Sequence, residues 1–266
     1  MPTLPDSATA LRAATNRFIA MVRDVDESQL ASIVPATPDW TVRQAISHVA
    51  LGAAYYADCL AGRDQWVDSP TQTAEKNTAL LEIRRGVPVP TALADMAGAV
   101  DEVIDLLAAL GDEPVGFHAR QLLTPQGIQS MLVNEVLVHG HDVAQALRRP
   151  WKIPDDEAIL ALQAMTALCA AWLDPVKSAG HTASYQIRLR GRYEDIWLVF
   201  RSGKLSVGSD SPQKRADCVV YGPPSSLLLV MTGRLSPMGA FLRLKSVSWG
   251  RKPWLGLTLS RRFRSI

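Results

Sequence analysis

The spacing of apolar residues changes once along the chain, near residue 183, and this change limits the fold more than any other feature. Before it, apolar residues recur at the three- and four-residue intervals of amphipathic helices. From Tyr185 to Arg190, apolar and polar residues alternate instead, as in a half-buried strand. The chain is therefore predicted to join a helical part to a smaller part that contains strands.

Cap and turn signals divide the first part into helices. Thr41 and Gln44 have the spacing of a capping box, so a helix should begin there, and Gly111 is well placed to end another. Ser7 is the candidate cap of the first helix. Further helices are expected at about 74–84, 91–110 and 128–147, and from 155 or 156 to about 173. Long helices joined by turns predict an up-and-down bundle.

The last third is predicted to be a small α+β domain. Short strands are expected at 185–190, 196–200, 205–207, 218–221 and 244–249, with an apolar helix at 225–231. The charge also divides, because residues 1–180 carry 13 Lys and Arg against 22 Asp and Glu, whereas residues 181–266 carry 15 against 4. The predicted fold class is α+β with two domains, a helical bundle over 1–178 and the small domain over 183–266.

Several classes of protein fit this sequence poorly. Cys59, Cys169 and Cys218 are far apart and odd in number, which argues against both a disulfide framework and a thiolate zinc site. The N-terminal residues lack the pattern of a signal peptide, and no apolar stretch is long enough to span a membrane. We expect a cytoplasmic protein without a membrane partner.

One group of polar residues in apolar surroundings suggests chemistry. Glu135 and His139 are four residues apart, so both side chains should share one face of an otherwise apolar helix. A buried carboxylate and imidazole need a partner, and a divalent cation satisfies both. His48, on the apolar face of another helix, is the best candidate for a third ligand. A paired core histidine or a solvated Glu–His pair is the alternative interpretation of the same residues.

Two segments resemble a known family. Residues 38–48, PDWTVRQAISH, are similar to the W-(S/T)-V-x-x-x-x-x-H signature of mycothiol-dependent maleylpyruvate isomerases, which belong to the DinB-like metal-binding four-helix bundles. The Glu135-x-x-x-His139-x-x-Asp142 pattern resembles the second signature of that family. Residues 216–235 resemble its second domain, which is similar to sterol-carrier domains. The resemblance extends over nearly the whole chain, except for 87–124, which have no clear counterpart.

The resemblance implies a metal site and a thiol cofactor. His48, Glu135 and His139 would be the metal ligands, with zinc or another divalent metal bound, and mycothiol would be the thiol. Asp142 is expected either to hold an imidazole N–H from outside the ligand set or to cap the next element. His141 stands where the family usually has an aromatic residue, so it is either an acid–base group at the pocket mouth or a surface residue.

The basic second domain suggests where a substrate would be held. Arg234 and Arg243 are candidates for binding a substrate carboxylate, with a solvated surface position as the alternative for each. The substrate is expected to be a small electrophile, and anionic electrophiles are among the candidates. The basic tail at 261–264 is too short to favour nucleic acid as a partner, and the oligomeric state is left open.

Three functions remain open from the sequence. The first is a metal-dependent, mycothiol-using enzyme, either a cis–trans isomerase of the maleylpyruvate type or an S-transferase. The second is a carrier that holds an apolar ligand in residues 184–266 without needing a metal. The third is a metal-stabilised protein without turnover, in which protein side chains, with His141 or His118 among them, fill all coordination positions.

Overall fold

The computed structural model describes residues 4–191, 195–209 and 215–264, and it divides them into two compact units, Leu4–Ile153 and Pro154 onward. The division falls between Ile153 and Pro154, whereas the sequence predicts a boundary at about 177–183. The outermost residues of both predicted domains, 1–3 and 265–266, lie outside the described residues. No helix among the described residues is long and apolar enough to cross a membrane.

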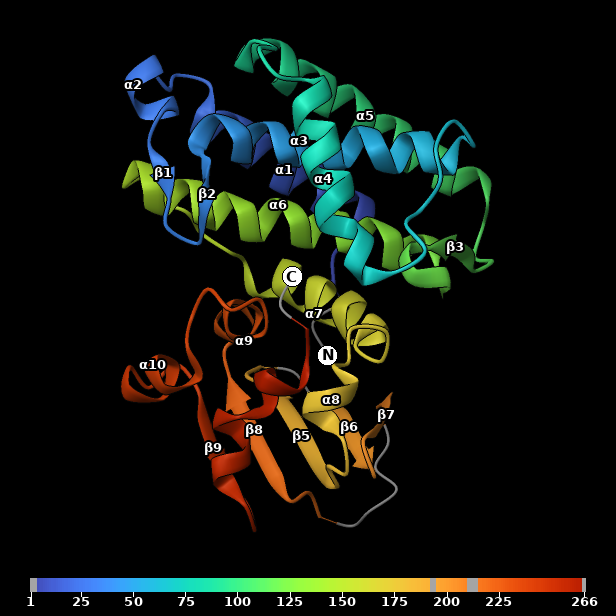
Figure 1. The fold of residues 1–266 in the computed structure, drawn as a ribbon, viewed down its shortest axis with the longest axis vertical. Coiled ribbons are helices and arrows are strands. Elements are labelled where there is room, and N and C mark those ends of the chain that lie inside the picture. The colour runs from blue at the N-terminus through green and yellow to red at the C-terminus, as the bar shows by residue number, and fades with distance from the viewer. Residues whose placement is uncertain (1–3, 192–194, 210–214, 265–266) are drawn as a thin grey trace. The chain divides into compact units, whose positions relative to one another are not determined.

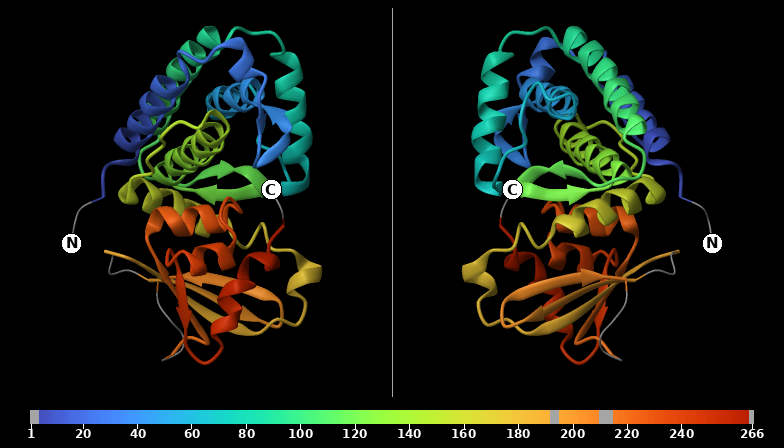
Figure 2. Two further views of the ribbon diagram at one scale, coloured as in Figure 1. Left: turned by 90° about the vertical axis from the view of Figure 1, so that its left-hand side faces the viewer. Right: turned by 90° about the vertical axis from the view of Figure 1, so that its right-hand side faces the viewer.

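The first unit is a helical bundle (Figures 1 and 2). Its helices are α1 (Ser7–Val22), α2 (Glu27–Leu30), α3 (Val42–Leu60), α4 (Thr73–Ile83), α5 (Val89–Ala109) and α6 (Pro125–Leu147). Two short antiparallel hairpins complete it, β1 (Ile33–Val34) with β2 (Thr37–Thr41) and β3 (Val115–Phe117) with β4 (Gln121–Leu123). The bundle confirms the predicted fold, and the two hairpins are additions that the sequence analysis did not foresee.

Caps set the ends of the two helices that matter most for function. Thr41 and Gln44 form the predicted capping box at the start of α3. Thr124 caps α6, with Pro125 at its first position, and Arg148 ends it in the left-handed conformation. The first helix differs slightly from the expectation, because Asp6 rather than Ser7 caps α1. The ends of α3 and α6 are thus fixed by local hydrogen bonds as well as by packing.

Tight packing fixes the C-terminal half of α6. The indole nitrogen of Trp151 donates a hydrogen bond to the carbonyl oxygen of Leu137 at 3.0 Å. The ring then lies directly against Gly140, where an added Cβ would come within 2.3 Å of Trp151 Cζ2. Gly140 is therefore required by this contact, and the contact braces the part of α6 that carries Glu135 and His139.

The second unit is built on a five-stranded mixed sheet in the order β7-β6-β5-β8-β9, in which only β5 and β8 run parallel. Its strands are β5 (Ala183–Leu189), β6 (Ile196–Arg201), β7 (Lys204–Gly208), β8 (Cys218–Gly222) and β9 (Val247–Trp249). Its helices are α7 (Asp155–Leu168), α8 (Pro175–Ser178), α9 (Pro224–Met231) and α10 (Pro237–Leu242). Helix α7 packs against α9. The predicted α+β class is confirmed, and α10 was not expected.

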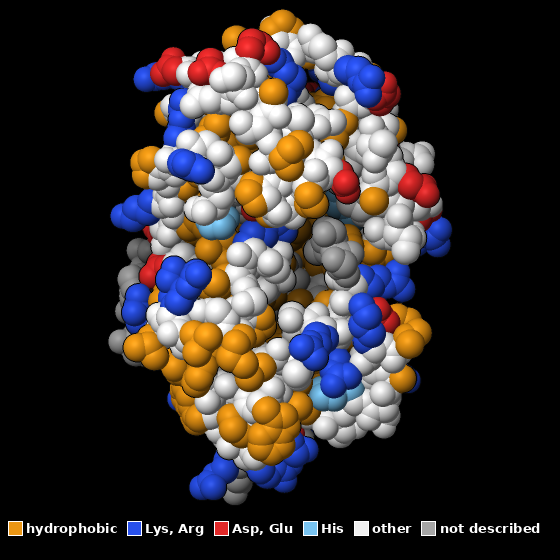
Figure 3. Space-filling view, turned by 60° about the vertical axis from the view of Figure 1, so that its left-hand side comes forward, with side chains coloured by type: hydrophobic (Ala, Val, Ile, Leu, Met, Phe, Trp, Pro, Cys, Tyr) orange, Lys and Arg blue, Asp and Glu red, His pale blue; other side chains and the backbone are white. Residues whose placement is uncertain are grey.

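The surface of the second unit mixes apolar and basic side chains (Figure 3). Its exposed large apolar residues include Met238, Phe241 and Leu242 on α10 and Leu244 just after it. Arg243 is exposed between Leu242 and Leu244, and Lys245 is exposed directly after Leu244. The excess positive charge of residues 181–266 is therefore interrupted by apolar surface on this face.

Candidate metal centre

The three predicted ligands come together between α3 and α6. Glu135 Oε2 lies 3.8 Å from His48 Nε2 and 3.5 Å from His139 Nε2. One ligand atom from each of the three residues lies within 4.8 Å of the other two. The side chains are mostly buried but reachable, with 12% of His48, 30% of Glu135 and 12% of His139 exposed. Two helices that are distant in sequence thus bring two imidazoles and one carboxylate to one point.

These residues fit a zinc-like divalent ion. Two ligands bound at about 2.0–2.2 Å and separated by the tetrahedral angle lie roughly 3.3–3.6 Å apart. The Nε2–Oε2 separations of 3.5 and 3.8 Å are close to that range. Two histidines and one carboxylate are also a usual ligand set for a catalytic zinc, which keeps a further position open. Among the described residues the group has three members, and neither His118 nor His141 joins it.

Asp142 supports one of the histidines from behind. Its carboxylate Oδ2 lies 3.3 Å from His139 Nδ1, so the other ring nitrogen, Nε2, faces Glu135. Asp142 is 1% exposed, which rules out the role of a solvated surface acid. A carboxylate behind a metal-binding imidazole fixes the ring orientation and its tautomer. The position of Asp142 fits the first of its two predicted roles, and that role stays a prediction.

The electrostatics of the site favour positive charge. Burial alone would raise the pKa of the Glu135 carboxyl, but the imidazoles of His139 and His48 outweigh burial and hold that pKa well below its usual range. Burial lowers the pKa of His139, whereas Asp142 and Glu135 raise it, and the two carboxylates prevail. Two carboxylates around one imidazole stabilise a cation at this point. A bound divalent ion would supply that charge.

Trp40 is a site residue that the sequence analysis did not single out. It lies on β2, directly before the Thr41 cap, and its ring centroid is 4.7 Å from that of His48 and 6.0 Å from that of His139. The His48 and His139 rings are themselves 4.7 Å apart and nearly perpendicular. Trp40 therefore packs over both histidines and shields one side of the centre. The W-(S/T)-V signature contained this signal, because its tryptophan immediately precedes the capped helix.

The remaining predicted residues lie elsewhere. His141 Nδ1 is 3.7 Å from Asp142 Oδ1, and the side chain is 21% exposed. Arg234, whose guanidinium donates to the carbonyl oxygen of Thr232 at 2.7 Å, and the exposed Arg243 both belong to the second compact unit. Their roles in this site stay predictions.

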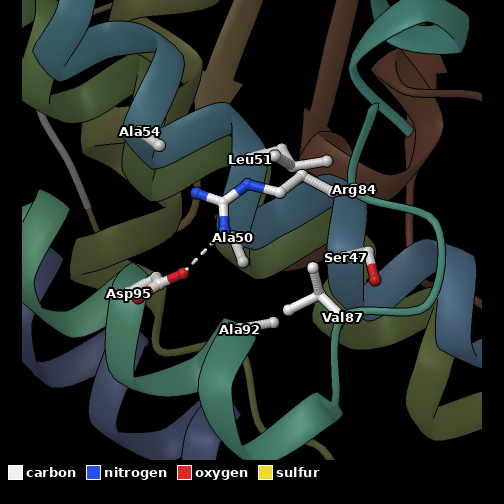
Figure 4. A pocket seen from close by; sticks show the side chains of 8 residues that line it. All are labelled: Ser47, Ala50, Leu51, Ala54, Arg84, Val87, Ala92 and Asp95. Atoms are coloured by element: carbon white, nitrogen blue, oxygen red, sulfur yellow. Dashed lines mark hydrogen bonds and ion pairs between the residues drawn. The ribbon is translucent and has the colours of Figure 1, made fainter. Parts of the chain in front are cut away.

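A small cavity beside α3 is not a substrate pocket. It has a volume of about 20 Å³, enough for about one water molecule. Figure 4 shows Arg84 at its edge, paired with Asp95 at 2.9 Å, while Ala50, Leu51 and Val87 supply apolar walls. The candidate chemistry therefore remains at His48, Glu135 and His139.

The family follows from the sequence match over the helical unit. Residues 11–144, half of the chain, match the family model described as "Mycothiol maleylpyruvate isomerase N-terminal domain". The chain belongs to the mycothiol-dependent maleylpyruvate isomerase family. Residues 166–245 match the model of the SCP-2 sterol transfer family, so the sterol-carrier-like character of the second domain is also confirmed. Comparison with curated proteins finds no match.

Solved structures support the same fold over most of the chain. The crystal structure of the mycothiol-dependent maleylpyruvate isomerase is 15% identical, with a TM-score of 0.57, and the similarity covers 92% of each chain. The structure of a histidine-to-alanine mutant of that enzyme is 14% identical, with the same TM-score and coverage. At this level of sequence identity, the similarity shows that this chain shares the two-domain fold of those structures. The reaction of this protein has to be argued from its own residues.

Proposed function

We propose that this protein is a metal-dependent enzyme that uses mycothiol as a cofactor thiol or as a nucleophile. The observation that carries the proposal is the convergence of His48, Glu135 and His139 from two helices at separations suited to one divalent ion. Membership of the mycothiol-dependent maleylpyruvate isomerase family supports mycothiol as the thiol. The second domain, matched by the SCP-2 model, completes the architecture of that family.

His48, Glu135 and His139 would hold the ion, which is zinc or another divalent metal that accepts two imidazoles and one carboxylate. Such an ion lowers the pKa of a bound thiol, which is near 8.5 in the free state, so that the thiolate predominates at neutral pH. Asp142 orients His139 through Nδ1 and keeps its Nε2 directed at the centre. Trp40 covers the two imidazoles and limits the access of water from its side.

Two reactions are compatible with this arrangement. In the first, the thiolate adds to one carbon of an activated double bond, the resulting single bond rotates, and expulsion of the same thiolate leaves the isomer and regenerates the thiol. In the second, the thiolate forms a carbon–sulfur bond while a leaving group departs with the bonding electrons, and a proton is released. Arg234 and Arg243 are the candidates for holding a substrate carboxylate, and His141 for transferring a proton.

The second domain favours one alternative function. Because residues 166–245 match a sterol-transfer family, a carrier for an apolar molecule, with the bundle in a structural role, is the competing proposal. A carrier would bind its ligand equally well after metal removal, and replacing His48 would leave binding unchanged.

Thiol titration tests the proposal and separates the two reactions. Purified protein would be incubated with mycothiol and either maleylpyruvate or 1-chloro-2,4-dinitrobenzene, and both product and free thiol would be followed. Isomerisation forms product without consuming thiol, whereas transfer consumes one thiol for each product. Activity with either electrophile that is lost in His48→Ala would support the proposal. Product formation that proceeds equally in His48→Ala would contradict it.

A further inference from the structure

An accessible track leads away from the candidate metal centre between two otherwise buried helix faces. On α6, Met131, Glu135 and His139 stay partly accessible at four-residue intervals, while residues 132–134 and 136–138 are buried. On α3, Gly52 follows His48 by four residues, and a Cβ added there would have no neighbour within 4 Å. Helices α3 and α6 pack together and run in opposite directions (Figure 1). Gly52 thus leaves open space one turn beyond His48, and Gly52 and the partly accessible Met131 are together called the accessible track.

Five aromatic rings lie at the far end of this track. Tyr55 is less than one turn beyond Gly52 on α3, and its ring centroid is 5.7 Å from that of His118 and 5.6 Å from that of Trp66. Trp66 and His118 are 4.8 Å apart, and both remain partly accessible. The aromatic cluster comprises Tyr55, Tyr56, Trp66, Phe117 and His118. Tyr56 follows His48 by about two turns of α3, so the cluster begins on the side of the helix that carries His48.

The hairpin tip that presents His118 is strained and anchored. Ala119 and Arg120 adopt φ values of 56° and 57°, which non-glycine residues rarely do and which cost free energy. The Ala119 N–H donates to the carbonyl oxygen of Val67 at 2.8 Å, and Arg120 Nε lies 3.1 Å from Asp68 Oδ1. These two contacts therefore maintain a backbone conformation that Ala119 and Arg120 disfavour. They hold His118 within the cluster.

The imidazole of His118 has unused hydrogen-bonding capacity. Its Nδ1 is buried without a partner in the part of the chain that the structure describes. Burial lowers the pKa of His118 to about 4, against a smaller opposing effect of Glu135, so the ring is neutral at pH 7. A neutral imidazole offers one donor and one acceptor. A buried polar group without a partner is unfavourable, so a ligand atom that pairs with it would be stabilised.

Charges around the aromatic cluster disfavour an anion. The Lys76 ammonium lies 4.8 Å from the Tyr55 ring but is paired with Asp64 at 2.6 Å. Arg120 is likewise paired with Asp68. Because both cations are paired, neither is free to bind an anionic group at the cluster. Flat apolar rings and a neutral imidazole are suited to an uncharged planar group.

We propose that the aromatic cluster binds an uncharged planar group of the substrate, hydrogen-bonded to His118, and that Gly52 leaves the space through which the substrate reaches the metal centre. The inference rests on the proposed function, because it names the substrate class of the same site. It makes Gly52 and His118 residues that determine specificity. A side chain at Gly52 would fill this space, one turn beyond His48 on the same face of α3.

A pair of isosteric probes tests the proposal. Binding of 4-nitrobenzamide and of 4-nitrobenzoate, which differ in charge but hardly in shape, would be measured by equilibrium dialysis with the full chain at pH 7. We expect the uncharged amide to bind at least tenfold more tightly than the anion. Gly52→Leu should weaken amide binding at least tenfold, and His118→Phe, which keeps an aromatic ring but no hydrogen-bonding atom, about fivefold.

The controls separate this proposal from folding effects and from the proposed function. Gly98→Leu, at an exposed glycine of α5 that also has open space, should change amide binding less than twofold. The comparison of the two probes needs only the wild-type protein. Binding requires neither thiol nor turnover. If the amide bound as predicted but the protein showed no thiol-dependent activity, the proposed enzyme function would be refuted and the proposed binding site would stand. Equal or tighter binding of 4-nitrobenzoate, no binding of the amide at millimolar concentration, or an unaffected Gly52→Leu variant would overturn it.

Discussion

Asp142 Oδ2 lies 3.3 Å from His139 Nδ1, one turn further along α6, and is almost completely buried. This pairing leaves His139 Nε2 free to face Glu135, 3.5 Å away. Asp142, which lies outside the candidate ligand set, is therefore placed to orient one of the candidate ligands. The contact links the sequence spacing Glu135-x-x-x-His139-x-x-Asp142 to the geometry of the centre.

Replacing Asp142 should weaken metal binding without removing it. In Asp142→Asn the shape is kept, but the negative charge that orients and polarises His139 is lost. We expect the zinc affinity to fall about 10- to 100-fold, as for other residues that support metal ligands. Competition with a chromophoric chelator measures this. Asp105→Asn, at an exposed position of α5, removes the same charge as a control and should leave the affinity unchanged. Equal affinities for both variants would exclude the orienting role.

Gly140→Ala should destabilise the helical unit although alanine favours helix. The new Cβ would lie 2.3 Å from Trp151 Cζ2, and the indole is held by its hydrogen bond to Leu137. Overpacking of this kind costs about 1–3 kcal/mol. Urea unfolding would measure the loss. Gly98→Ala, where the added Cβ meets nothing, should instead raise the free energy of unfolding by about 0.5–1 kcal/mol. A Gly140→Ala variant as stable as Gly98→Ala would contradict the packing.

The stability of the protein should depend on pH through His118. Burial holds the folded pKa at about 4, below the ordinary value of 6.5, and Glu135 opposes this only in part. Above pH 6.5 the ring is neutral in both states. Between pH 6.5 and 4 only the unfolded state gains the proton, so the free energy of unfolding falls as pH falls, by about 3 kcal/mol in total.

The His118→Phe variant isolates this contribution. Urea unfolding of metal-free wild type and variant would be compared from pH 7.5 to 4.5, because other titrating groups cancel in the difference. The wild type should lose stability more steeply below pH 6.5 than the variant. Parallel curves would show that His118 is not held neutral by burial.

Local sequence signals predicted the elements that carry the metal ligands. The Thr41–Gln44 capping box located the start of α3 and therefore the turn that carries His48. The four-residue spacing of Glu135 and His139 placed both on one face of α6. These features depend on interactions within a few residues, so a sequence pattern contains them.

Features made by contacts between distant segments could not be predicted in the same way. Strands β3 and β4 have three residues each, too few for an alternating pattern, so the hairpin that carries His118 gave no signal. Trp40 was not singled out, because its packing on His48 and His139 depends on the β1–β2 hairpin. The boundary between the compact units was expected later, because α7 continues the helical pattern although it packs against α9.

Metal content tests the central claim most directly. The protein would be purified without an affinity tag, and bound metals would be measured by elemental analysis in wild type, His139→Ala and His141→Ala. The account predicts about one divalent ion per chain in wild type and in His141→Ala, and its loss from a folded His139→Ala. A wild type that binds no metal even after zinc is added, or a His139→Ala variant that retains it fully, would contradict the account.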